Sequence, residues 1–228
     1  MKWLIDCADV SIPALRDMPA LGTPEGTFPE RVAVEENGEP LVSLEEHLKV
    51  YRVYSWMGFD HASATLRVRA GVLERLVRAS ANLPSGFELA VIDSHRTRIF
   101  QAELMSHYQK ETEQSLEGYV SDPDSTTLIP PHTTGGAVDL TLAWRGAVLG
   151  IGTDFDAFSP KSAPGWFESR EADGKARDLR RLLASVLSAE DMVVIDTEWW
   201  HWSYGDQRWA AQTGAPAALY GEIVANSD

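Results

Sequence analysis

The apolar positions of this chain switch between helical and strand-like spacing along its length. Apolar side chains three or four residues apart predict amphipathic helices over 64–81, which ends before the turn signal at 84–86, over 98–116 and over 176–187. A shorter helix is predicted over 43–50, which begins with a Ser-x-x-Glu capping box. No internal repeat interrupts this pattern.

Strand patterns lie between and after these helices. A nearly continuous apolar run at 87–93 predicts a buried strand, and the two-residue alternation at 137–144 predicts another, with a hairpin return at 147–149. Residues 192–196 and 199–204 are also strand-like. This mixture predicts an α+β fold, in which helices pack on a small mixed or antiparallel sheet.

The length of 228 residues predicts a single compact domain over 1–228, since a chain of this size can build its own core. Frequent prolines near the start predict an extended N-terminal wrap over 1–60 around a core at 61–210. The polar stretch 117–131 and the irregular stretch 153–175 are expected to be loops.

Charge and cysteine content exclude several classes of partner. With 20 Lys and Arg against 34 Asp and Glu, the formal charge is −14, which repels nucleic-acid backbones and anionic lipid. No apolar run approaches the roughly 20 residues of a membrane span. Cys7 is the single cysteine, and the acidic Asp6 interrupts the apolar start that a secretory signal needs. We therefore expect a cytoplasmic protein.

Two segments carry candidate chemistry. Within 130–139, His132 leaves a loop, two glycines allow a sharp bend, and Asp139 follows as a strand begins. His201, much later in the chain, adds a third side chain that can bind a metal. Three such ligands with an open position for water form a catalytic zinc site, and Glu198 would be the base beside that water.

The spacing of Glu198 and His201 sets a condition on this hypothesis. Residues an odd number apart point to opposite faces of a regular strand, so both reach one metal only if the backbone breaks near 196–197. The helical His-Glu-x-x-His zinc motif is absent. On spacing alone, structural roles remain alternatives to a metal site: the histidine would hold a loop, the acid would cap a turn, and the tryptophans would pack in the core.

These segments resemble the zinc D-alanyl-D-alanine dipeptidases. The resemblance rests on His-Thr-Thr-Gly-Gly-Ala-Val-Asp-Leu-Thr-Leu at 132–142 and Glu-Trp-Trp-His at 198–201. It extends over residues 66–210 and implies zinc-dependent hydrolysis of D-Ala-D-Ala or a related small dipeptide. Further motifs occur in the order typical of the family, at 93–96, 152–156, 181–183 and 204–207.

The resemblance also implies the roles of particular residues. His132, Asp139 and His201 would bind one zinc ion per chain, and the partner would be the small dipeptide itself. Glu198 would be the general base and acid, because a carboxylate can take the proton of water and pass it to the leaving amine.

Two charged residues would contact the substrate in this family. Arg96 would be the cation that faces the scissile carbonyl, with Arg98 as its nearest competitor. Asp156 would be the acid that receives the free ammonium of the substrate. The alternatives are that Arg96 forms a surface ion pair and that Asp156 is an ordinary acid in a loop.

The tryptophans at 199–202 would close the pocket to longer chains.

The sequence departs from the family pattern near the substrate. Pro130 stands where a serine is frequent, Ser94-His95 replaces Gly-Tyr before Arg96, and 188–195 lacks the usual Gly-Phe. Every ligand and the base are kept. A D,D-carboxypeptidase or endopeptidase acting on larger peptidoglycan peptides is therefore the alternative activity, and a non-catalytic binding protein of the same fold is a third.

Overall fold

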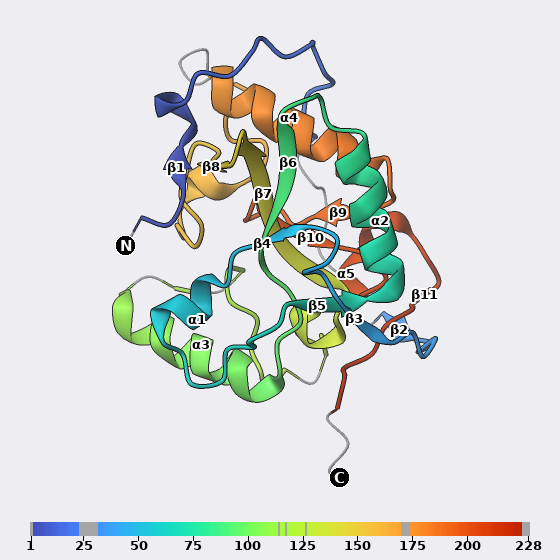
Figure 1. Cartoon of the computed structure of the whole chain (residues 1–228). Helices are drawn as coiled ribbons and strands as arrows, with labels where there is room; N and C mark the ends of the chain where they lie inside the picture. The colour runs from blue at the N-terminus through green and yellow to red at the C-terminus, as the bar shows by residue number, and fades with distance from the viewer. Residues whose placement is uncertain are drawn as a thin grey trace.

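A seven-stranded mixed sheet forms the centre of the molecule (Figure 1). The structure, a computed structural model, describes residues 2–22, 32–113, 115–116, 118–125, 127–169 and 174–224. The two longest strands, β6 (Phe87–Asp93) and β7 (Ala137–Trp144), pair antiparallel. The opposite edge of β7 pairs with β8 (Ala147–Gly150) and β10 (His201–Ser203). The strands predicted at 87–93, 137–144 and 147–149 are confirmed.

Short strands extend this sheet and flank it. β9 (Val193–Val194) pairs antiparallel with β10, β4 (Lys49–Val50) runs parallel to β6, and β1 (Ile5–Asp6) runs parallel to β8. Two separate ladders join β2 (Ala33–Val34) to β11 (Ala217–Ala218) and β3 (Leu41–Ser43) to β5 (Arg67–Arg69). Strands from the N-terminal sixty residues therefore lie along elements from much later in the chain.

Five α-helices cover the sheet in the described part of the chain: α1 (Val53–Met57), α2 (Ala70–Ala81), α3 (Arg98–Glu111), α4 (Gly174–Ser188) and α5 (Gln207–Thr213). Figure 1 shows α2 and α4 at one end of the sheet, and α1 and α3 at the other. The predicted apolar face of α4 is buried, including Leu179, Leu183 and Val186. The α+β fold is confirmed. No helix within the described ranges is long and apolar enough to cross a bilayer.

The structure corrects one helix prediction and shortens two others. No helix forms over 43–50: residues 44–48 form a turn between β3 and β4, and the Ser43 hydroxyl accepts from the Glu45 backbone N–H at 3.2 Å. The helix predicted over 64–81 begins only at Ala70, because β5 pairs with β3 and buries Val68 as strand. The helix predicted to reach residue 116 ends at Glu111.

The strands predicted near the C-terminus are also shorter than expected. Only Val193–Val194 and His201–Ser203 are strand, and the chain between them turns. The backbone therefore breaks at Asp196–Thr197, as the candidate site requires. Three short 3-10 helices complete the described elements: η1 (Cys7–Asp9), η2 (Pro131–Thr134) and η3 (Pro160–Ser162).

Candidate metal centre

A tight connection between η2 and β7 positions His132. Gly135 ends η2 in the left-handed conformation, with φ 72°. Gly136 leaves no room for a side chain, since an added Cβ would lie 2.7 Å from the Tyr204 carbonyl oxygen. These two glycines allow the chain to turn from His132 directly into the central strand.

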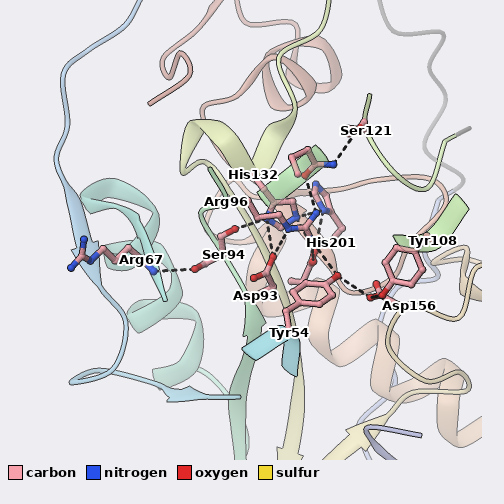
Figure 2. Close-up of polar contacts among 12 residues, drawn as sticks. Tyr54, Arg67, Asp93, Ser94, Arg96, Tyr108, Ser121, His132, Asp156 and His201 are labelled. Atoms are coloured by element: carbon pink, nitrogen blue, oxygen red, sulfur yellow. Dashed lines mark hydrogen bonds and ion pairs between the residues drawn. The ribbon is translucent and has the colours of Figure 1, made fainter. Parts of the chain in front are cut away.

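The register of β7 and β10 positions the other two ligand candidates. Asp139 stands directly opposite His201 in this antiparallel pair, so both side chains leave the same face of the sheet. His132 reaches the same face from η2, which runs into β7 (Figure 2). The structure thus brings together three residues that are separated by up to 69 positions in the chain.

Three ligand atoms converge on one point. His201 Nδ1 lies 3.1 Å from His132 Nε2 and 3.1 Å from Asp139 Oδ1. His132 Nε2 and Asp139 Oδ1 are 3.3 Å apart. Ligand atoms of a tetrahedral zinc site, at about 2.0–2.2 Å from the metal, stand roughly 3.3–3.6 Å from each other. The three atoms therefore fit a zinc ion closely.

Hydrogen bonding and burial hold these side chains in their metal-binding forms. His132 Nδ1 lies 2.7 Å from the Ser94 carbonyl oxygen; because a carbonyl only accepts, Nδ1 carries the proton and Nε2 is left to bind a metal. Burial lowers the pKa of His201 to about 4, against the opposing hydrogen bond with Asp139, so this imidazole is neutral. Burial would raise the pKa of Asp139, but the two histidines hold it below its ordinary value, so this carboxylate is ionised.

Arg96 is fixed beside the three ligand candidates. Its Nε donates to Asp93 Oδ2 at 2.5 Å, Nη1 to Gln101 Oε1 at 3.1 Å, and Nη2 to Asp139 Oδ2 at 3.0 Å. Burial alone would lower the pKa of Arg96, but the charge of Asp93 outweighs it and raises the pKa. The competing Arg98 instead pairs with Glu222 and does not line the cavity.

Glu198 lines the same cavity as the three ligand candidates. Its side chain lies on the turn between β9 and β10, and the residue is only 5% exposed. Burial raises the pKa of Glu198 well above its ordinary value, and the nearby charges of Asp139 and Asp156 raise it further. The site therefore favours the protonated form of this carboxyl group more than water does.

Asp156 stands across the cavity in a constrained position. Its backbone adopts φ 55°, which side-chain-bearing residues rarely do, and its Oδ2 accepts hydrogen bonds from the hydroxyls of Tyr54, at 2.8 Å, and Tyr108 (Figure 2). Burial raises the pKa of Asp156 to about 7, although the tyrosine hydroxyls oppose the shift. The cavity is small and partly open, which suits a small ligand.

Several residues of the site have no obvious signal in the sequence. Tyr54 and Tyr108 come from helices that pack side by side only in the folded chain, and Gln101 is one polar residue among many on α3. Asp93 belongs to the Asp-x-x-Arg motif at 93–96, but the sequence gives no indication that it holds Arg96 in place. Of the tryptophans at 199–202, only Trp200 lines the cavity, and the other two pack in the core.

Comparisons with known proteins identify the family of the chain. Residues 58–216 match the family described as D-ala-D-ala dipeptidase (Peptidase_M15). A D-alanyl-D-alanine dipeptidase of Synechocystis sp. is 29% identical over 218 residues, covering 79% of this chain and 88% of that protein. A solved structure of the LdcB LD-carboxypeptidase has 18% identity and a TM-score of 0.44, with 91% of each chain covered. Since the family match spans well over half of its residues, the chain belongs to the D-ala-D-ala dipeptidase family of peptidases.

Proposed function

We propose that this protein hydrolyses D-Ala-D-Ala, or a closely related small dipeptide, with one zinc ion held by His132, Asp139 and His201. The observation that carries the proposal is the convergence of three ligand atoms within 3.3 Å of one another, in the cavity that Glu198 lines. Zinc bound there would polarise the scissile carbonyl and lower the pKa of a water molecule towards about 7.

Glu198 moves the proton in this proposal. In its ionised form the carboxylate accepts a proton from the attacking water, and in its protonated form it delivers that proton to the leaving amine. Burial raises the pKa of Glu198, which makes its carboxylate a stronger proton acceptor than a carboxylate in water.

Arg96 stabilises the charge that develops on the carbonyl oxygen. A guanidinium has five N–H donors, and the contacts of Arg96 with Asp93, Gln101, Asp139 and Tyr54 use at most four. The remaining Nη1 N–H can donate to the substrate. Because its neighbours hold the side chain in place, this donor needs no reorganisation as the oxyanion forms.

Asp156 receives the free ammonium of the substrate. The two tyrosine hydroxyls bind Oδ2, so they hold the carboxylate at one end of the cavity while leaving Oδ1 for a ligand. A cation there would form an ion pair in a largely desolvated site, which is costly to break by removing one partner.

The decisive experiment measures the release of free D-alanine from D-Ala-D-Ala, N-acetyl-D-Ala-D-Ala and a tripeptide ending in D-Ala-D-Ala. We expect the free dipeptide to have the highest kcat/KM, and a chelator to abolish turnover until zinc is added back. Comparable kcat/KM for all three substrates would favour the D,D-carboxypeptidase activity instead. No D-alanine from any of them, with zinc bound, would contradict the proposal.

A further inference from the structure

Arg180 is a buried cation that the proposed mechanism does not use. It lies on α4 and is only 2% exposed, and burial lowers the pKa of its guanidinium to about 9, so the group keeps its charge at neutral pH. A charge removed from water is costly unless hydrogen bonds replace the lost hydration. The contacts of Arg180 therefore indicate which part of the molecule it stabilises.

The guanidinium joins two ends of one irregular segment. Its Nε donates to the Ile151 carbonyl oxygen at 2.9 Å, directly after β8. Its Nη2 donates to the Lys161 carbonyl oxygen at 2.9 Å, and Nη1 donates to that of Ala163 at 2.6 Å, where η3 ends. All described hydrogen bonds of this guanidinium end on backbone carbonyl oxygens, on either side of Asp156.

Trp199 connects this segment, residues 151–164, to the turn that carries Glu198. Its indole Nε1 donates to Thr153 Oγ1 at 2.8 Å, and its backbone N–H donates to the Ser162 carbonyl oxygen at 2.9 Å. Since Trp199 directly follows Glu198 in the chain, these contacts join the segment of the proposed ammonium acceptor to the proposed proton carrier.

We propose that Arg180 and Trp199 are positioning residues for Asp156, which hold its carboxylate at the distance from Glu198 that a free dipeptide requires. This inference rests on the proposed function and extends it to two residues that do not line the cavity. The two side chains also contact each other, since the Arg180 guanidinium carbon lies 5.6 Å from the centre of the Trp199 ring.

The backbone of Asp156 needs such support. Its φ of 55° is a conformation that a residue with a side chain keeps only when its surroundings impose it. Tyr54 and Tyr108 bind the carboxylate, whereas the contacts of Arg180 restrain the backbone before and after Asp156. A shift of about 1 Å at this acid would weaken its ion pair with the substrate ammonium.

The test compares D-Ala-D-Ala with N-acetyl-D-Ala-D-Ala, which has no ammonium for Asp156 to bind. Arg180→Met should lower kcat/KM for the free dipeptide by about 10–100-fold, mainly by raising KM, and should change the N-acetyl form by less than about threefold. In the Asp156→Asn background, Arg180→Met should not raise KM further, because no carboxylate is left to position. Arg177→Met removes another arginine of α4, paired with Asp178, and is the matched control that should keep wild-type values.

Thr153 provides a second pair of variants that tests the same segment if Arg180→Met does not fold. Thr153→Val keeps the shape of the side chain but removes the acceptor of the Trp199 indole N–H. It should lower kcat/KM for the free dipeptide by about 3–10-fold, again through KM and not for the N-acetyl form. Thr153→Ser, which keeps the hydroxyl, should restore the wild-type values.

Equal losses for both substrates, or a lower Tm with an unchanged KM for the free dipeptide, would show that Arg180 and Trp199 only stabilise the core. Either result would overturn the inference and leave the proposed function intact. If the wild type cleaves neither compound, the proposed function fails. Calorimetry of both compounds with zinc-loaded protein, with and without Thr153→Val, then decides the inference: a loss of affinity confined to the free dipeptide supports it, and an equal loss or no loss contradicts it.

Discussion

At the residue scale, environment separates the carboxylates of this site more than residue type does. Asp139, held between two imidazoles and Arg96, keeps its charge and is suited to bind a metal. Glu198 and Asp156 face the same cavity with raised pKa values, because burial disfavours their charged forms. The same chemical group can therefore be a ligand, a proton carrier or a binding site for an ammonium.

Glu198→Gln should keep the bound metal and the fold but lower kcat by about 10²–10⁴-fold, because an amide cannot accept and return a proton. Metal content, thermal stability and D-alanine release would be measured together. Glu74→Gln, at a surface position with a 71% exposed side chain, is the matched control. Near-wild-type turnover in Glu198→Gln would show that this residue only packs in the site.

The pKa of Asp156, about 7, predicts a pH dependence of substrate binding. Below this pH the carboxyl group is protonated and cannot pair with an ammonium, so KM for D-Ala-D-Ala should fall as the pH rises through about 7. N-acetyl-D-Ala-D-Ala, which has no ammonium, should not show this fall. Asp156→Asn should raise KM for the free dipeptide and remove its pH dependence in this range. The same profile in Asp156→Asn would assign the titration to another group.

At the element scale, the pairing of β7 with β10 brings together two of the proposed metal ligands. Asp139 and His201 face each other because the register of this pair fixes them there, and a slip by one residue would turn one of them to the other face. The tight glycine connection then sets where η2 leaves His132.

Gly136→Ala tests this connection. The new Cβ would lie 2.7 Å from the Tyr204 carbonyl oxygen, so the start of β7 and the end of β10 must move apart. We expect a loss of about 1–3 kcal/mol in the free energy of unfolding and weaker zinc binding. Gly165→Ala, where the nearest atom is 3.7 Å away, should change neither. Urea unfolding and zinc titration of both variants would decide.

At the scale of the whole molecule, the core does not depend on the metal. Buried apolar side chains from the central sheet, α2 and α4 form one continuous cluster. A chain of this size can bury enough apolar surface to stay folded without a structural ion. Metal binding should therefore add stability to a protein that is already folded.

His132→Ala and His201→Ala should each lose the single zinc ion and remain folded. At free zinc 100-fold above its Kd, binding should stabilise the wild type by about 2.7 kcal/mol, or raise its Tm by roughly 5–10 °C, and this rise should be absent in both variants. His47→Ala, at an exposed position, should behave as the wild type. Full zinc retention in both ligand variants would exclude this metal centre.

The sequence by itself determined the strands, helices and residue types that depend on local pattern. β6 is a continuous apolar stretch, and β7 and α4 each show a regular spacing of apolar residues over eight or more positions. The sequence therefore predicts the bounds of all three elements within two residues. His132, Asp139, Glu198 and His201 were recognisable because their motifs are short and local in the chain.

Only the tertiary structure decided the features that depend on distant partners. Residues 43–50 and 67–69 have helical spacing but form strands and a turn, because β3 and β5 find each other across more than twenty residues and their ladder outweighs local propensity. The hydrogen bonds of Tyr54 and Tyr108 to Asp156, and of Arg96 to Asp139, likewise form where separate helices and strands meet. Burial there sets the pKa of each acid, and no sequence pattern carries that information, because desolvation is a property of the packed chain.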